Sequence, residues 1–159
     1  MVWLKTPTVE GNEFSWLTEE GSLTERLKKE FHDVAVEVCF EGDCPLDKNF
    51  YMREVILKSN GNPMIFARTL VKEDDLEKVW GALKNLGDQS LATILFNSAE
   101  IKKTSVFYKE LSLDDPLFVH VSSISPIHKK SLWAKKSLWE KQGAYLDLVE
   151  VFLVNNPNL

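Results

Sequence analysis

Cysteine is scarce in this sequence, since Cys39 and Cys44 in the stretch "CFEGDC" are the only two among 159 residues. One close pair without a second cluster of Cys or His is a poor metal site. The three histidines are not spaced as metal ligands either. We therefore interpret the two cysteines as reduced thiols, with Cys39 in a strand, and expect no metal site.

Long apolar runs are also absent, because no window approaches the roughly 20 apolar residues that span a bilayer. The first residues, "MVWLKTPTVEGNEF", lack the basic segment and apolar core of a signal peptide. Positive charge is not in surplus, because the formal net charge is −5, and non-specific nucleic-acid binding needs a basic surface. We expect a cytoplasmic protein that neither spans a membrane nor binds nucleic acid.

The composition is that of an ordinary soluble globular domain, with 44% hydrophobic and 27% charged residues. The length suits one domain with a substantial core and is too short for two. No internal repeat or interdomain linker is found in the sequence. We expect a single domain over residues 1–159, acting as a monomer.

Strand patterns outnumber helix patterns along the chain. The clearest pair is 50–58 and 63–71, two apolar stretches on either side of "SNGNP", whose Asn-Gly pair is a strong β-hairpin signal. Residues 133–141 fit an exposed strand or a short helix equally well. Because short turns rather than helical crossovers join the strands, the predicted class is α+β with a mainly antiparallel sheet. Other predicted strands cover 33–40, "EIKKTSVFYKEL" and 144–154, and helices cover 15–31 with a break at Gly21, 73–86 and part of "DQSLATILF".

Two of the predicted helices begin with capping signals. Ser22 is followed three residues later by Glu25, which is the pattern of a capping box. Asp88 or Ser90 provides a cap for the short helix in "DQSLATILF".

Two arginines interrupt the apolar hairpin. If the Asn-Gly pair is a two-residue turn, Arg53 faces Arg68 across the ladder, whereas a three-residue loop would shift this register by one. Arg53 shares its strand face with Tyr51, Val55 and Leu57. Like charges repel, and an unpaired buried charge is costly. We therefore expect an anion beside the arginines, either a carboxylate of the protein or a bound ligand.

Glu150 is the third unusual charge. It shares one face of the predicted last strand with apolar side chains that include Leu146, Leu148 and Phe152. Glu150 is either a structural counter-ion to one of the arginines or part of a small polar spot in an apolar ligand cavity. Two arginines against one glutamate leave a positive surplus, which favours an anionic ligand.

Several segments, taken in order, resemble the chorismate lyase family. They are "WLTEEGSLTERL", "YMREVILKSNGNPMIFART", "LGDQSLATILF", and "SLWAKKSLW" leading into "LVEVFL", and together they cover most of the chain. The resemblance implies an enzyme that converts chorismate to 4-hydroxybenzoate and pyruvate without a cofactor, for ubiquinone synthesis in bacteria. It also implies a six-stranded antiparallel sheet with helices on one side and helical flaps over a buried ligand site.

The resemblance also implies the site residues. The family's carboxylate-binding arginine corresponds to Arg53, its motif glutamate to Glu150, and its two backbone donors to the ring carboxylate to Leu23 and Leu91. Both leucines follow the expected helix caps, where N–H groups lack intrahelical partners. Arg68 matches a second family arginine, for which we expect the enolpyruvyl carboxylate as partner. The stretch "SLDDPLFVHVSSISPIHKK" is longer than the family pattern, and we expect it to alter a surface hairpin or the access route.

Two other functions remain possible at this point. The first is a non-catalytic, effector-binding domain like the ligand domains of bacterial transcription regulators, which have a similar fold. Such a sensor normally follows a helix-turn-helix module, for which this sequence has no room. The second is a structural protein in which the Arg and Glu residues form a buried ion-pair network.

Overall fold

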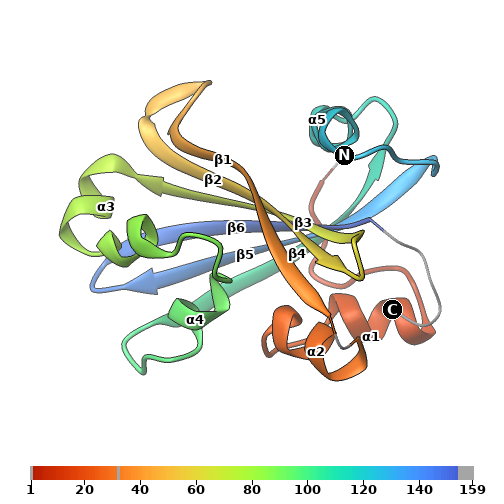
Figure 1. The fold of residues 1–159 in the computed structure, drawn as a ribbon, viewed down its shortest axis with the longest axis horizontal. Helices are drawn as coiled ribbons and strands as arrows, with labels where there is room; N and C mark the ends of the chain where they lie inside the picture. Colours follow the sequence, from red (N-terminus) through yellow and green to blue (C-terminus); the bar gives the residue numbers. More distant parts are fainter. Residues whose placement is uncertain (1, 32, 154–159) are drawn as a thin grey trace.

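A six-stranded antiparallel sheet forms the centre of the computed structural model (Figure 1), which describes residues 2–31 and 33–153. The strand order is β1-β2-β3-β6-β5-β4, so two three-stranded meanders meet along β3 and β6. The predicted fold class is confirmed. The strands are β1 (Val34–Cys44), β2 (Asp47–Ser59), β3 (Asn62–Lys72), β4 (Lys102–Ser112), β5 (Ser131–Lys141) and β6 (Ala144–Phe152).

Two groups of short helices cover one face of this sheet, as Figure 1 shows. One group lies near the N-terminus, and the other comes from the segment between β3 and β4. The first group consists of α1 (Gly11–Leu17) and α2 (Leu23–Glu30), and the second of α3 (Glu73–Lys78), the 3₁₀ helix η1 (Gly81–Asn85) and α4 (Ala92–Leu95).

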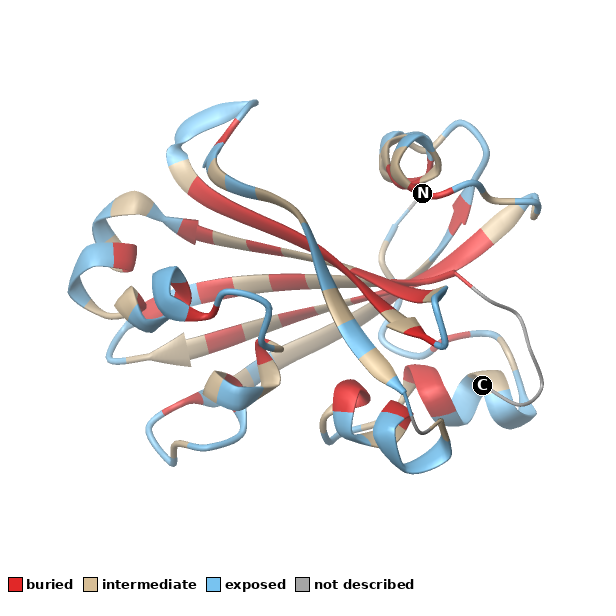
Figure 2. Ribbon diagram, viewed as in Figure 1, coloured by how far each residue is buried: buried red, intermediate tan, exposed pale blue. Residues whose placement is uncertain are grey.

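Each helix group closes its own hydrophobic cluster against the sheet. Trp16 and Leu27 pack with Ile65 and Phe152 beneath α1 and α2. Beneath α3, η1 and α4, the cluster combines sheet residues such as Leu146 with helical side chains. The middle of β2 is buried on both faces (Figure 2), because the sheet is covered on both sides. The helical members of the second cluster are Leu76, Trp80, Leu83, Leu86, Leu91 and Leu95.

A further helix, α5 (Pro116–Ile124), covers the opposite face of the sheet, where no helix was predicted. Asp115 caps it by accepting a hydrogen bond from Leu117 N at 2.9 Å, and Pro116 occupies the first turn. Phe118 and Val121 pack on Phe66 and other side chains of that face. The segment 112–130 connects the paired strands β4 and β5, so it alters that hairpin as one of the two expected alternatives, and it forms a helix away from the face that carries α1 to α4.

The predicted helix over 73–86 is broken into α3 and η1. Val79 leaves the helical conformation with φ −130°, and the chain restarts as a 3₁₀ turn at Gly81. The break lets Trp80 donate from Nε1 to Ala144 O at 3.4 Å, and Trp80 remains in the core as expected.

The ambiguous stretch 133–141 belongs to strand β5, which is second from the edge and pairs with both β4 and β6. It is not an exposed strand, because Leu132, Trp133, Ala134 and Trp139 are buried. Its two faces therefore both contribute to the packed sheet.

The hairpin between β2 and β3 has the expected turn but not the expected register. Asn60 and Gly61 have φ of 52° and 78°, as in a type I′ turn. Ser59 pairs with Asn62 and Lys58 with Pro63, but the register then shifts, so that Arg53 pairs with Thr69. The extra residue enters next to Pro63, which has no N–H to continue the ladder.

This bulge makes the prediction that Arg53 faces Arg68 wrong. A shift of one residue moves every later side chain of β3 to the other face. Arg68 pairs instead with Glu54, on the α5 face. Arg53 stays on the face that carries the two helix groups, together with Tyr51 and Leu57.

Over residues 2–31 and 33–153, no helix combines the length and apolar character that crossing a membrane requires.

Candidate active site

A cavity of about 50 Å³ lies between the two helix groups and the sheet. Its floor comes from β2, β3, β5 and β6, Lys103 of β4 borders it, and its roof comes from the starts of α2 and α4. Most of the wall is apolar, with a few polar groups pointing inward, which is the usual composition of a small-molecule site. The floor residues are Val55, Leu57, Ala67, Lys135, Ser137, Trp139, Leu148 and Glu150, and the roof residues include Ser22, Leu23, Thr24, Ser90, Leu91 and Phe96.

Glu150 is the carboxylate of the cavity floor. The register places it between Ala67 of β3 and Lys135 of β5, and the surface that it retains faces the cavity. Burial raises the pKa of Glu150, while the nearby ammonium groups of Lys135 and Lys103 oppose that shift. Glu150 thus lies on the predicted face as a desolvated acid with two lysines nearby.

The sequence prediction missed Lys135 and Lys103, which both line the cavity. Lys135 Nζ donates to Glu19 O at 2.6 Å, and Lys103 Nζ donates to Glu20 O at 3.2 Å. The two lysines therefore hold successive carbonyl groups of the connection between α1 and α2. Burial lowers the pKa of Lys135, and the carboxylate of Glu150 opposes that shift. A strand assignment for 133–141 would have placed Lys135 on one face with Trp133 and Trp139, and this was the available signal.

The backbone of Leu23 and Leu91 lies at the two helix starts, and both residues line the cavity. Ser22 Oγ accepts a hydrogen bond from Glu25 N at 3.1 Å, which confirms the cap of α2. The N–H of Leu23 is in the first turn of α2 and therefore has no intrahelical partner. The two helix starts are thus directed toward the same space.

The two helix starts also contact each other directly. Thr24 Oγ1 and Ser90 Oγ lie 2.8 Å apart. Ser90 Oγ additionally accepts from Ala92 N at 3.1 Å, so Ser90 caps the turn that begins α4. This pair of hydroxyl groups joins the two roof segments above the cavity.

Arg53 lies on the same sheet face as Glu150 but is not part of the cavity wall. It is only 2% exposed, and its Nη2 donates to Gly87 O at 3.2 Å and Gln89 O at 2.9 Å. Its Nε is buried without a hydrogen-bond partner. Arg53 therefore anchors the loop that leads to Leu91, and part of its guanidinium is left unsatisfied.

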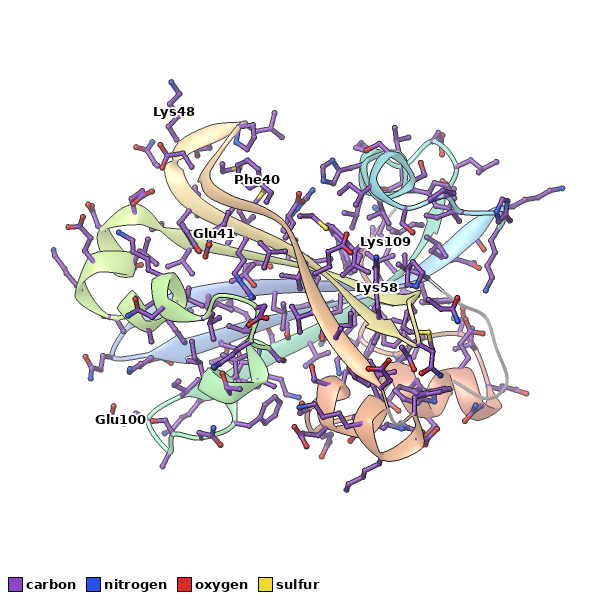
Figure 3. The ribbon with its side chains drawn as sticks, viewed as in Figure 1. Phe40, Glu41, Lys48, Lys58, Glu100 and Lys109 are labelled. Atoms are coloured by element: carbon purple, nitrogen blue, oxygen red, sulfur yellow. The ribbon has the colours of Figure 1, made fainter. Side chains whose placement is uncertain are left out.

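A carboxylate of the protein does lie near Arg53, but it is Glu41 rather than Glu150. Glu41, which is labelled in Figure 3, pairs with Arg53 in the register of β1 and β2 and accepts a hydrogen bond from Tyr51 Oη. Burial lowers the pKa of Arg53, and the charge of Glu41 opposes this. Burial and the bond to Glu41 raise the pKa of Tyr51. Since Arg53 bonds two carbonyl groups and the acid that opposes its pKa shift is Glu41, Glu150 is not its counter-ion.

Arg68 is separated from the cavity by the sheet. Its Nε donates to Glu54 Oε2 at 2.8 Å, and His120 Nε2 of α5 lies 2.9 Å from the same oxygen. Glu54 is 2% exposed. The structure therefore brings Leu23, Leu91 and Glu150 together, places Arg53 beside them, and does not bring Arg68 to the site.

Comparison with known protein structures adds a fold relationship. The effector domain of PhnF from Mycobacterium smegmatis superposes with a TM-score of 0.60 at 14% identity, covering 86% of this chain and 90% of that chain. At this low identity the similarity shows a shared fold and nothing more.

Comparison by sequence gives a closer relationship. A probable chorismate pyruvate-lyase from Nitrosomonas europaea is 31% identical over 150 residues, covering 87% of this chain and 84% of its relative. A chorismate pyruvate-lyase from Pectobacterium atrosepticum is 30% identical over 154 residues, with 89% and 77% covered. The family model described as chorismate lyase matches residues 1–158. The chain therefore belongs to the chorismate lyase family.

Proposed function

We propose that this chain is an enzyme that converts chorismate to 4-hydroxybenzoate and pyruvate, and that the cavity above Glu150 is its active site. The observation that carries this proposal is one desolvated carboxylate beneath two helix starts in a mostly apolar cavity. We infer that the enzyme acts as a monomer in the cytoplasm.

In this proposal the ring carboxylate lies at the end of the cavity near the helix starts. The N–H groups of Leu23 and Leu91 donate to it, as first-turn N–H groups do to anions. Arg53 contributes Nε, which is buried and has no partner in the described structure. A bound carboxylate would satisfy this donor, and charge-assisted hydrogen bonds are strong in a dry site. Arg68 has no part in the proposal, because it bonds Glu54 on the other face.

Binding requires the roof to move. A cavity of about 50 Å³ is smaller than the roughly 300 Å³ at the lower end of small-molecule pockets. The roof segments are short and connected by loops, and they are held by the hydroxyl pair of Thr24 and Ser90 and by the lysine bonds to Glu19 O and Glu20 O. Opening and closing of these two segments would admit chorismate and exclude water around it.

Glu150 would accept a hydrogen bond from the 4-hydroxyl of the substrate. As the C3–O bond breaks, its electron pair leaves with the enolpyruvyl oxygen, and loss of the C4 hydrogen makes the ring aromatic. Negative charge beside the hydroxyl favours the release of electron density from the ring in the transition state. The C4 hydrogen leaves either as a proton to a base or directly to the enolpyruvyl methylene in a cyclic step, and both routes give pyruvate.

The experiment that tests this function mixes the protein with chorismate and follows pyruvate and 4-hydroxybenzoate. Equal amounts of both products are expected. In addition, 4-hydroxybenzoate should raise the Tm because it binds only the folded state, and benzoate should raise it less. A protein that forms no pyruvate and whose Tm is indifferent to both compounds would contradict the proposal.

The second candidate is a domain that binds a small aromatic acid without transforming it. The shared fold with the effector domain of PhnF is the observation that favours it. Saturable binding of chorismate with no pyruvate release would support this candidate over the enzyme.

A further inference from the structure

Lys135 is a buried cation for which the proposed mechanism has no use. Its side chain is 4% exposed, and it lines the cavity. Its Nζ donates one hydrogen bond, to Glu19 O at 2.6 Å. An ammonium group has three donors, so this bond leaves two for a ligand. Burying an ammonium group is expensive, Glu150 offsets part of that expense, and a second anion in the cavity would offset more of it.

The register places Lys135 directly across from Glu150, on the adjacent strand. Directly paired side chains of neighbouring strands are about 5 Å apart. If Glu150 accepts from the hydroxyl at C4, the neighbouring ring carbon C3 and its enolpyruvyl group lie within reach of the adjacent strand. Arg53, by contrast, is on β2, separated from β6 by β3, roughly 10 Å away across two strand spacings.

Resting on the function proposed above, we propose that Lys135 binds the enolpyruvyl carboxylate of chorismate and so distinguishes substrate from product. The substrate carries this second carboxylate and the product does not. Lys135 would hold the leaving group in place beside the carboxylate that faces the 4-hydroxyl. Its bond to Glu19 O would connect occupancy of this subsite to the α1–α2 segment of the roof.

Two other cations suit this role less well than Lys135 does. Arg68 faces away from the cavity and bonds Glu54. Lys103 lines the cavity, but it is on the edge strand β4, donates to Glu20 O, and lies 5.6 Å from the centre of the Trp139 ring. Lys103 adds positive potential near Glu150, whereas Lys135 is the cation paired with Glu150 across the ladder.

The test uses Lys135→Met, which keeps the length of the side chain and removes its charge. The matched control is Lys136→Met, because Lys136 is the next residue of β5 and contacts Asp147 and Trp3 rather than the cavity. We expect kcat/KM for chorismate to fall at least about tenfold in Lys135→Met, as for a lost hydrogen bond between charged groups. We expect the Kd of 4-hydroxybenzoate to change by less than about twofold. Lys136→Met should change neither quantity.

A pair of unreactive ligands isolates the carboxylate contact. The first is 4-hydroxybenzoate with a carboxymethoxy group at position 3, and the second carries a methoxy group there. The parent protein should prefer the carboxymethoxy compound, and Lys135→Met should lose that preference. Lys135→Gln and Lys135→Arg serve the same comparison if the Met variant does not fold. The Arg variant should keep part of the preference, because its charge is retained.

Three results would overturn the proposal. Equal losses for chorismate and 4-hydroxybenzoate would mean that Lys135 only holds the roof. An unchanged kcat/KM for chorismate would remove Lys135 from the site. A parent protein with no preference for the carboxymethoxy compound would do the same. Failure of the proposed function is a separate result, since it appears as absence of pyruvate release from the parent while the ligand preference is still measurable by binding.

Discussion

Glu54 of β2 and Arg68 of β3 form an ion pair of 2.8 Å on the α5 face of the sheet. His120 of α5 contacts the same carboxylate at 2.9 Å, and its ring meets Phe66 edge to face. The pair is asymmetric in burial, because the Glu54 side chain is 2% exposed and the Arg68 side chain 25%. The interaction therefore secures a buried carboxylate beneath α5 and belongs to the folding of that face rather than to the cavity.

Replacing Arg68 should therefore reduce stability without affecting the reaction. Arg68→Met leaves a buried carboxylate with only His120 as its side-chain partner, and we expect a loss of about 2–3 kcal/mol in the free energy of unfolding. The value is below that of a fully buried pair, because Arg68 is partly exposed. Denaturant melts and chromatographic assays of 4-hydroxybenzoate measure the two effects, and a large fall in kcat/KM with unchanged stability would return Arg68 to the site.

The position of Arg68 shows where the sequence was insufficient. The Asn-Gly turn was predicted correctly, and so was the face of Arg53, because alternation in β2 depends on nothing beyond that strand. The register of β3 depends on one bulge next to Pro63. A proline shortly after a tight turn is compatible with such a bulge, but the turn alone predicts the symmetric register, which places Arg68 on the wrong face.

Glu150 and Lys135 also show which site residues a local sequence pattern can and cannot reveal. Glu150 was found because it is a lone carboxylate among apolar side chains on one face of a mostly apolar strand. Lys135 was not, since "WAKKSLWEK" fits two kinds of local structure, and only pairing with β4 and β6 decides between them. The loop bonds of Arg53 and the roof contact of Thr24 with Ser90 join residues far apart in the chain, for which no local pattern exists.

Thr24→Val should loosen the roof. The substitution removes the hydroxyl that contacts Ser90 Oγ and leaves the Ser90 bond to Ala92 N in place. We expect faster release of 4-hydroxybenzoate and a Kd raised by about threefold to tenfold, in line with the loss of one hydrogen bond of about 1 kcal/mol.

A thermodynamic cycle with Ser90→Ala controls this experiment. If the two hydroxyl groups act through each other, the effect of the double variant on the binding free energy should be smaller than the sum of the effects of Thr24→Val and Ser90→Ala. Fully additive effects of the two substitutions on Kd would show that the contact contributes nothing to ligand retention.

Arg53→Ala should affect both stability and binding. It removes the donors to Gly87 O and Gln89 O, which frees the loop before α4, and it removes the proposed cation for the ring carboxylate. We expect the binding free energy of 4-hydroxybenzoate to weaken by roughly 3–5 kcal/mol, as for a broken buried pair. Arg53→Lys should recover only part of it, because an ammonium lacks the planar fork of guanidinium.

Arg68→Met is the matched control for this experiment, since it removes a second arginine of the same hairpin from the opposite face. Calorimetry of 4-hydroxybenzoate binding and melting curves are compared for the three variants. If Arg53→Ala lowers the Tm but binds product as tightly as Arg68→Met does, Arg53 serves only the loop.

Glu150→Gln should separate the catalytic role of the carboxylate from a structural one. The amide keeps the shape and an acceptor oxygen, no arginine depends on Glu150 as a counter-ion, and Lys135 keeps its hydrogen bond to Glu19 O, so the Tm should stay near that of the parent. We expect the rate of the chemical step to fall at least about tenfold, equivalent to roughly 1.4 kcal/mol in the barrier. Single-turnover rates measure this step, because product release beneath the roof can limit kcat. A sharply lower Tm with an unchanged single-turnover rate would assign Glu150 to the fold instead.

The pH dependence tests the same residue independently. Burial raises the pKa of Glu150 above its ordinary value of 4.5, so the ionised form is present only at pH values above that raised pKa. The acid limb of kcat/KM, which reports groups of the free enzyme, should therefore lie above pH 4.5 and be absent in Glu150→Gln.

The effect of Glu150 on stability should change with pH in the direction opposite to that of a salt-bridged acid, because the folded state retains the proton to higher pH than the unfolded state does. Stability of the parent relative to Glu150→Gln should fall as the pH rises from the unfolded pKa to the raised folded pKa, and stay constant above it. Paired melting curves across this range measure the difference, and a parent that gains stability over Glu150→Gln with rising pH would mean that Glu150 is held by a cation in the folded state.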